Sequence, residues 1–469
     1  MKTRFAWTFG LFIVLLLWQC QSKPTAQDEN TAKQDATQKE TAPAQGLKHP
    51  EWSKNLSIYE VNIRQYTPEG TFKAFQTHLP RLKALGADIL WLMPINPIGE
   101  KNRKGKLGSY YAVKDYKAVN PEFGTMDDFK NLVKEAHKLG MYVIVDWVPN
   151  HTAWDNPIAA EHPDWFAKNE KGEFTPPKGT DWTDVIQLDY SQPGLRQYMK
   201  EALQFWVKEA DIDGYRCDVA GKVPTDFWNE VRPALDAIKP VFMLAEWEAT
   251  DLHEKAFDMT YAWSFYDLMH QLHKGKNNAD SVRKYFQKDL AEYPASAYRM
   301  RFVDNHDKNS WDGTMFSQFG AYLEACIVLT GTAKGMPLIY TGQEAGLDRQ
   351  LKFFEKDEVK WQEHPIGDLY KKLFKLKKEH PALWNGAFGG EMHLTKNTQP
   401  AEVFSFVREK EGKKVLAVFN FSKKAQKTQI QDEKAAGEYQ DYFGAQTLKI
   451  TPEASLDLPP GGYRVLVQK

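Results

Sequence analysis

The chain has 469 residues, enough for about three domains of ordinary size or for one large barrel with additions. Lysine and arginine together number 61 and aspartate and glutamate 62, so the formal net charge is −1, which argues against a nucleic-acid-binding protein. Aromatic residues make up 13% of the chain, which fits either a large core or a cleft whose rings stack on sugars.

The first residues are typical of a targeting segment. Lys2 and Arg4 precede an apolar run at 5–18, which is too short for a typical membrane-spanning helix. Cys20 follows this run, and the arrangement resembles the lipobox of bacterial lipoproteins, in which the cysteine is lipidated. We therefore expect a lipoprotein signal peptide at 1–20 and a lipid anchor on Cys20. The protein would then lie on a membrane of the bacterial cell envelope, on its periplasmic or outer-surface side. An uncleaved anchor and ordinary secretion are the alternatives.

Residues 21–46 contain no leucine, isoleucine, valine or aromatic residue. Such a segment cannot bury enough apolar surface to offset the entropy lost on ordering. We expect a disordered tether over 21–50 and an ordered body that begins near Trp52.

Strand-like and helix-like segments then alternate along the chain. Apolar periodicity predicts helices at 71–85, 127–139, 193–210, 224–238, 315–329 and 367–379. Apolar runs predict strands at 56–63, 88–94, 142–148, 212–219, 241–246, 257–261, 298–303 and 336–340. Eight strands that alternate with helices favour a (β/α)8 TIM barrel over 51–386, with a doubly wound sheet as the rival.

Two segments break this alternation. Residues 150–189 are rich in proline, glycine and tryptophan and follow the third strand, so they predict an inserted domain with a functional role. After 387 the pattern changes to alternating runs at 401–408, 414–421, 440–450 and 462–468. These runs predict a C-terminal antiparallel β-sandwich domain over 387–469.

Polar clusters end four of the predicted barrel strands. Asp146 lies near the end of the third predicted strand, and Asn150 and His151 follow it. Arg216 and Asp218 lie near the end of the fourth strand, Glu246 ends the fifth, and His306 and Asp307 follow the seventh. Reactive residues of barrel enzymes lie at these strand ends. One cluster alone could be a structural ion pair, but four in succession indicate a catalytic site.

The chemistry that these carboxylates suggest is glycoside hydrolysis, which needs two carboxyl groups. Arg216 lies two residues before Asp218, so both side chains point to the same face of a strand, and we expect the cation to keep Asp218 ionised as a nucleophile. Glu246 has apolar neighbours in sequence, which would raise its pKa as a proton donor requires.

From about residue 56 to the C-terminus the chain resembles the α-amylase family of retaining glycoside hydrolases. The matching motifs are Asp146…Asn150-His151, Gly214-x-Arg216-x-Asp218, Glu246, Asn305-His306-Asp307, Gln187-Leu188-Asp189-Tyr190, the segment 335–344 and the segment 111–125. The resemblance implies the barrel, the insert and the C-terminal β domain together.

The resemblance also implies residue roles. Asp218 would be the nucleophile, Glu246 the general acid/base, and Asp307 the residue that stabilises the distorted sugar and the transition state. The supporting set binds substrate around the reacting ring: Arg216 would orient the nucleophile, His151 and His306 would hydrogen-bond sugar hydroxyls, Tyr111 would stack beneath the ring, and Asp146 would support the site.

One departure from the family pattern follows the nucleophile. Family members often carry a Lys-His pair there, and this chain has Gly221-Lys222. Lys222 could substitute for the family lysine in contacting sugar, or it could be solvated. Asn150 lies where the family places a calcium ligand, so calcium is the cofactor that the resemblance implies, and no organic cofactor is expected. The basic loop 99–107 could rim the cleft or could be a solvated charge run.

The expected activity is hydrolysis of α-1,4-glucosidic bonds in starch-derived glucans or maltooligosaccharides. A glucanotransferase or isomerase of the same family is the alternative, and a non-catalytic glycan-binding lipoprotein is a third. The third predicts loss of at least one of Asp218, Glu246 and Asp307, and all three are present. The first strand begins close to the tether, without room for an N-terminal module of the kind that dimeric relatives carry, so we expect a monomer.

Overall fold

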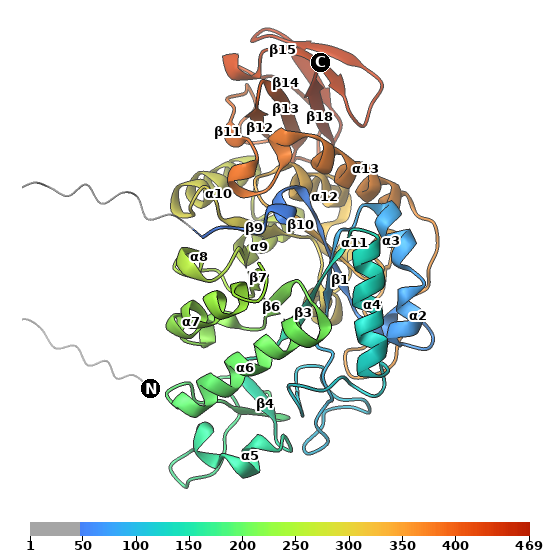
Figure 1. Ribbon diagram of the computed structural model, residues 1–469. Helices are drawn as coiled ribbons and strands as arrows, with labels where there is room; N and C mark the ends of the chain where they lie inside the picture. The colour runs from blue at the N-terminus through green and yellow to red at the C-terminus, as the bar shows by residue number, and fades with distance from the viewer. Residues whose placement is uncertain (1–46) are drawn as a thin grey trace, which may run out of the picture. The chain divides into compact units, whose positions relative to one another are not determined.

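The computed structural model of the protein describes residues 47–469 (Figure 1). The predicted signal peptide, the lipidation site at Cys20 and most of the predicted tether lie outside these residues. Within 47–469, no helix has both the length and the apolar character needed to cross a membrane.

Eight parallel strands close into a barrel, in the order β1-β10-β9-β8-β7-β6-β3-β2. They are β1 (Ile58–Val61), β2 (Ile89–Leu92), β3 (Tyr142–Trp147), β6 (Gly214–Cys217), β7 (Phe242–Ala245), β8 (Met259–Tyr261), β9 (Tyr298–Arg301) and β10 (Met336–Tyr340). Each strand falls within one of the predicted segments, and the TIM barrel is confirmed. Nearly every strand residue is buried, which explains why the sequence shows continuous apolar runs there.

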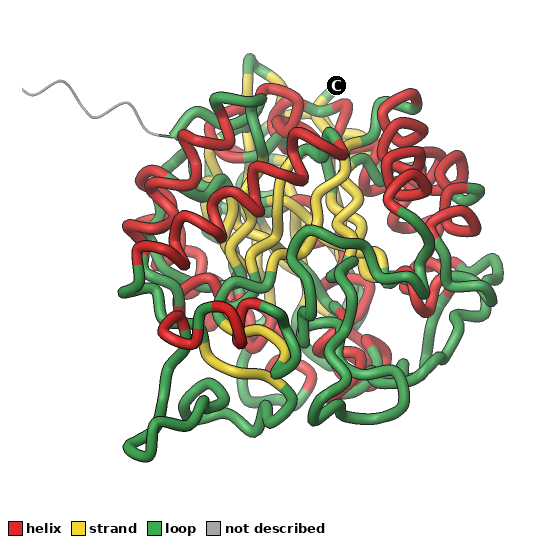
Figure 2. The backbone as a smooth tube through the Cα atoms, turned by 60° about the horizontal axis from the view of Figure 1, so that its bottom comes forward, coloured by secondary structure: helices red, strands yellow, loops and turns green. Residues whose placement is uncertain are grey.

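Helices surround the barrel, as Figure 2 shows. The longer ones are α4 (Met126–Lys138), α6 (Pro193–Ala210), α7 (Thr225–Asp236), α9 (Trp263–His273), α10 (Ala279–Glu292), α12 (Leu323–Thr332) and α13 (Pro365–Glu379). The shorter ones are α1 (Ile63–Tyr66), α2 (Phe72–Gln76), α3 (Leu79–Leu85), α5 (Ile158–Glu161), α8 (Leu252–Lys255) and α11 (Met315–Phe319).

Two helices predicted as continuous are broken. The segment 71–85 divides into α2 and α3, because Pro80 has no N–H to continue the hydrogen-bond ladder of α2. The segment 315–329 divides into α11 and α12 at Gly320, whose φ is 49°. Helices α9 and α10 have no counterpart among the predicted segments.

The C-terminal region forms two antiparallel sheets. The larger has the order β11-β12-β13-β18-β15-β16, and the smaller pairs β14 with β17. Their bounds are β11 (Glu391–Leu394), β12 (Val403–Lys410), β13 (Lys413–Asn420), β14 (Gln426–Gln429), β15 (Gly437–Asp441), β16 (Thr447–Ile450), β17 (Ser455–Leu458) and β18 (Tyr463–Gln468). Leu416 and Leu466 of the larger sheet pack with Leu456 and Leu458 of the smaller one. The predicted run 440–450 is a hairpin of β15 and β16 rather than one strand.

The segment between β3 and α6 carries its own small hairpin. Strands β4 (His151–Ala153) and β5 (Val185–Gln187) pair antiparallel, with His151 opposite Gln187. In Figure 1 this hairpin and α5 lie at the end of the barrel opposite the C-terminal sheets. Because β4 follows β3 directly, the segment stands at the C-terminal ends of the barrel strands, where it can form one wall of a site.

Candidate active site

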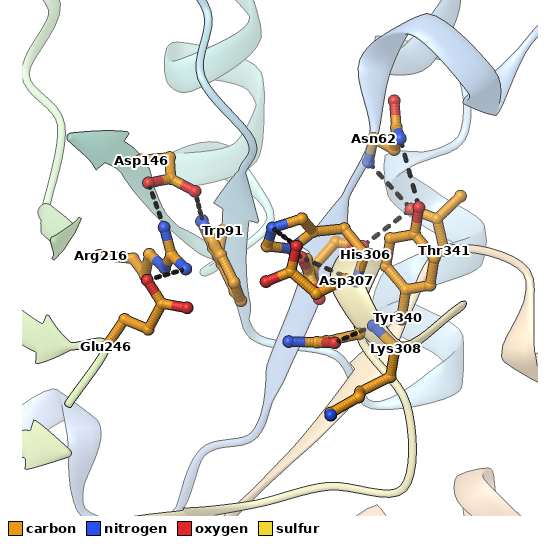
Figure 3. A network of polar contacts seen from close by, with 12 residues as sticks. Asn62, Trp91, Asp146, Arg216, Glu246, His306, Asp307, Lys308, Tyr340 and Thr341 are labelled. Carbon is orange, nitrogen blue, oxygen red and sulfur yellow. Dashed lines mark hydrogen bonds and ion pairs between the residues drawn. The ribbon is translucent and has the colours of Figure 1, made fainter. Parts of the chain in front are cut away.

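One buried cation holds three carboxylates together. Arg216 of β6 is fully buried, and its Nη1 lies 2.8 Å from Asp146 Oδ1 and 3.1 Å from Asp218 Oδ1. Its Nη2 lies 2.9 Å from Glu246 Oε2. Figure 3 shows the guanidinium between Asp146 and Glu246. The three acids follow or belong to β3, β6 and β7, which are neighbours in the barrel, so strand order alone brings them to one point.

Burial dominates the protonation of these acids. It raises the pKa of Asp218 to about 6 and the pKa of Glu246 to about 7, although Arg216 opposes both shifts. The pKa of Asp146 rises to about 6 for the same reason. Glu246 thus differs from the sequence interpretation in one respect, because it contacts a cation instead of lying among apolar neighbours alone. Asp218 differs as well, because burial raises its pKa to about 6 although Arg216, which we expected to keep it ionised, opposes the shift.

A series of hydrogen bonds through His306 and Tyr111 lies next to the ion pairs of Arg216. His306 Nε2 lies 2.8 Å from the Tyr111 hydroxyl, which in turn lies 3.0 Å from Asp146 Oδ2. On the other side of the ring, His306 Nδ1 lies 2.5 Å from Glu60 Oε1 of β1. Burial lowers the pKa of His306, but Asp307 and Glu60 outweigh burial and raise the pKa to about 9. His306 is therefore a cation that donates to Glu60 and Tyr111, and Tyr111 donates to Asp146.

Asp307 lines a cavity next to these hydrogen-bonded residues. Its side chain is 37% exposed, and its Oδ1 lies 3.4 Å from His306 Nε2. The exposed carboxylate and the buried Asp218 both line one cavity of about 490 Å³. A volume of this size is ordinary for a small-molecule site. Of the residues singled out in the sequence, the cavity is lined by Tyr111, His151, Asp218, His306 and Asp307.

His151 belongs to the wall that the insert contributes. Its ring centroid lies 5.2 Å from that of Trp182, and burial lowers the pKa of His151 to about 3. A neutral imidazole in this position can exchange hydrogen bonds with a sugar hydroxyl. Lys222 lies farther along the same wall, with its Nζ 5.0 Å from the Trp182 ring centroid.

Gly221 lies against the side chain of Trp247, the residue after Glu246, and leaves no space for a Cβ. A Cβ at position 221 would lie 2.2 Å from Trp247 Cε2, so only glycine lets the indole lie over this turn. Trp247 is 37% exposed. The departure from the family pattern at Gly221 is thus coupled to an aromatic face beside Glu246.

The surroundings of Asn150 do not fit a calcium ion. The Gln187 side-chain nitrogen donates to Asn150 Oδ1 and to the Asn150 carbonyl, at 2.9 Å each, and to the Leu188 carbonyl at 3.1 Å. Calcium takes about six to eight oxygen ligands, and here an amide N–H2 group uses the oxygens that a cation would need. Among residues 47–469, no cluster of three or more His, Cys, Asp or Glu side chains could hold a metal.

Several residues of the site escaped the sequence analysis. Glu60 and Trp91 are buried within β1 and β2, and Trp91 Nε1 donates to Asp146 Oδ2 at 3.2 Å. Phe353 lines the cavity from a loop and Trp311 lines it from the short helical segment Lys308–Asp312. A charged residue inside an apolar strand is the one available signal, and it applies to Glu60. Lys104 of the basic loop also lines the cavity, which favours the interpretation of that loop as a rim.

Comparison with known proteins is consistent with this geometry. A model of the alpha-amylase catalytic domain matches residues 33–436. The chain is 26% identical to Alpha-amylase 2 of Dictyoglomus thermophilum, over 86% of this chain and 75% of that protein. It is similar in structure to a noncanonic maltogenic alpha-amylase, AmyB of Thermotoga neapolitana (32% identity, 88% of this chain and 98% of that one, TM-score 0.81). It is also similar to an alpha-amylase of Lactobacillus plantarum (33% identity, 88% and 99%, TM-score 0.78).

Proposed function

This chain belongs to the alpha-amylase family and is a glycosidase, and we propose that it cleaves α-1,4-glucosidic bonds of maltooligosaccharides by double displacement with retention. The observation that carries the proposal is the shared contact of Asp218 and Glu246 with the two terminal nitrogens of Arg216. Retaining enzymes need the two carboxyl groups about 5–5.5 Å apart, and a single guanidinium between them favours such a short separation.

Each residue has a step in this reaction. Asp218 attacks the anomeric carbon while Glu246 protonates the departing oxygen, and Glu246 then activates the water that hydrolyses the glycosyl-enzyme. Asp307, exposed in the cavity, contacts the hydroxyls of the reacting ring and stabilises the positive charge that develops on it. Tyr111 supplies the ring face beneath the sugar and is fixed by its hydrogen bonds to Asp146 and His306.

A glucanotransferase is the second candidate, and Trp247 is the observation that favours it. Its exposed indole beside Glu246 offers a face on which an acceptor sugar could stack in place of water. The product profile on maltoheptaose separates the two activities. A hydrolase gives only saccharides shorter than the substrate, and a transferase also gives longer ones.

The proposal is tested with Asp218→Asn and with the anomer of the first product, followed by proton NMR. We expect at least about a 1,000-fold loss of kcat in the variant and an α-anomer as the initial product of the native enzyme. Asp181→Asn is the matched control, because Asp181 also lines the cavity but makes no ion pair with Arg216. Full activity of Asp218→Asn, or an initial β-anomer, would overturn the proposal.

We further propose that the enzyme is anchored by a lipid on Cys20, facing the periplasm or the outer surface of the cell. The charged start, the apolar run and the cysteine before a tether-like segment support this location. Cys20→Ala should release the protein from membrane fractions. Retention of the variant in those fractions would instead identify the apolar run as an uncleaved anchor.

A further inference from the structure

The loop 99–108, which contains the basic run 99–107, is hydrogen-bonded to other segments on both of its sides. On one side, Lys104 Nζ donates to the Asp181 carbonyl at 2.7 Å and lies 3.7 Å from Asp184 Oδ1 of the insert. On the other side, Leu107 N donates to the Phe354 carbonyl at 3.0 Å, and Lys106 N donates to Glu355 Oε1 at 2.9 Å. The loop therefore joins the insert to the segment 353–355, which follows β10.

This junction is closely packed. Gly105 has a φ of 63°, and a Cβ there would lie 2.4 Å from Phe354 Cβ. The buried guanidinium of Arg64 donates to the carbonyls of Leu107, Gly108 and Phe353 from below. The loop cannot move aside without the loss of several backbone hydrogen bonds.

The junction lies on the side of the site away from the leaving group. In the proposed reaction Glu246 protonates the glycosidic oxygen, so the leaving part of the substrate would extend past Glu246, over Trp247 and Gly221, and the glycosyl part would lie on Tyr111. From Tyr111 an aromatic series continues to Phe353 and then to Trp311, with ring-centroid distances of 6.2 and 5.4 Å. Phe353, Phe354, Trp311 and Lys104 line the cavity together with Asp181 and Asp184.

We infer that the loop 99–108 closes the glycosyl end of the cleft, so that the enzyme takes α-glucans from their non-reducing ends and releases short saccharides. This inference rests on the proposed function. A glucan bound by an internal segment would have to continue through the Lys104–Asp181 contact. A glucan whose non-reducing end lies within the cavity would not have to pass this contact. The exposed indole of Trp311 and the Phe353 ring offer the last sugar faces for stacking.

The test uses two aryl α-maltoheptaosides, one with a free non-reducing end and one with that end blocked by a 4,6-ethylidene group. Products that retain the aryl label are separated by chromatography. We expect the free substrate to lose one short saccharide at a time, and the blocked one to react at least about 100-fold more slowly. Equal rates on both would overturn the inference and leave the proposed function intact. No cleavage of either would overturn the proposed function and, with it, the inference.

Lys104→Ala identifies the loop as the cause of this selectivity. Loss of the contact with Asp181 should open the end of the cleft and raise the rate on the blocked substrate at least about 10-fold. Lys106→Ala is the matched control, because only its backbone N–H is tied to Glu355 and this bond is kept. An unchanged rate on the blocked substrate in a folded Lys104→Ala variant, or an equal gain in Lys106→Ala, would contradict the role of the loop.

Discussion

Arg216 Nη2 lies 2.9 Å from Glu246 Oε2, so the proposed proton donor is in direct contact with a buried cation. A cation alone would lower the pKa of a carboxyl group. Here burial outweighs it, and the pKa of Glu246 rises to about 7 against about 6 for Asp218. The same arginine contacts both acids and burial raises both pKa values by similar amounts, so most of the difference follows from the ordinary pKa values of 4.5 for glutamate and 3.8 for aspartate.

This order of pKa values predicts a bell-shaped pH profile of kcat/KM. Asp218 must be ionised, so activity should rise through about pH 6, and Glu246 must be protonated, so activity should fall above about pH 7. With a glycosyl fluoride, whose departure needs little protonation, Glu246→Gln should lose the alkaline limb and keep the acid one. An alkaline limb that persists in this variant would assign it to another group.

Glu246 should also reduce stability at neutral and alkaline pH. Its folded-state pKa of about 7 is above the ordinary value of 4.5, so the folded protein binds this proton more tightly than the unfolded chain does. The free energy of unfolding therefore falls as pH rises from about 4.5 through about 7. Glu246→Gln should be more stable than the native enzyme by on the order of 1–3 kcal/mol at pH 8, with little gain at pH 4.

Denaturant unfolding at the two pH values measures this difference. Asp181→Asn removes an exposed carboxylate from the cavity that Asp218 lines and should change stability equally little at both pH values. A gain in Glu246→Gln that is as large at pH 4 as at pH 8 would show that its origin is not the buried charge.

Glu60→Gln should act on catalysis through His306. The substitution keeps a hydrogen-bond acceptor for His306 Nδ1 but removes the charge that helps to hold the pKa of His306 at about 9. We expect the imidazole pKa, followed by NMR, to fall, and kcat/KM to decrease more at pH 8 than at pH 6. Glu344→Gln is the control, since Glu344 is equally buried but contacts Tyr59 and Arg81. An unshifted imidazole in Glu60→Gln would contradict the coupling.

The insert should not depend on calcium. Because the Gln187 amide satisfies the oxygens of Asn150 and Leu188, addition of EDTA should change neither Tm nor activity. Gln187→Ala leaves Asn150 Oδ1 and the Leu188 carbonyl without this donor, whereas the Asn150 carbonyl keeps its bond from Leu188 N, and the change should lower stability by about 1–3 kcal/mol. Gln192→Ala, which removes an amide that bonds only Asp189 and Ser191 near the surface, is the comparison. A fall in Tm on chelation would show that a metal is bound after all.

The barrel could be predicted from the sequence because its strands are buried on both faces and are therefore mainly apolar, although β9 carries Arg299 and Arg301. The breaks in the helices depended on single residues, Pro80 and Gly320, whose effects a periodicity count does not register. Strands β14 and β17 are four residues long with polar outer faces, so their pattern is too short to stand out.

The candidate site, too, could be predicted from the sequence only in part. Asp146, Asp218, Glu246 and Asp307 lie at strand ends, and the fold itself brings strand ends together. The contact between Glu60 of β1 and His306, which follows β9, joins residues 246 positions apart, so no local pattern reports it. The Gln187 amide reaches Asn150 only because the β4–β5 register places position 187 opposite 151.

The most direct test of the account is the mass of the glycosyl-enzyme. Glu246→Gln is incubated with an α-maltosyl fluoride, whose first step needs no proton donor while its second step lacks the base, and is then digested with a protease at low pH. The account predicts a maltosyl adduct on the peptide that contains Asp218, with fragmentation placing it on that carboxylate. An adduct on another carboxylate, or full turnover of the fluoride with no adduct and inverted product, would contradict double displacement at Asp218.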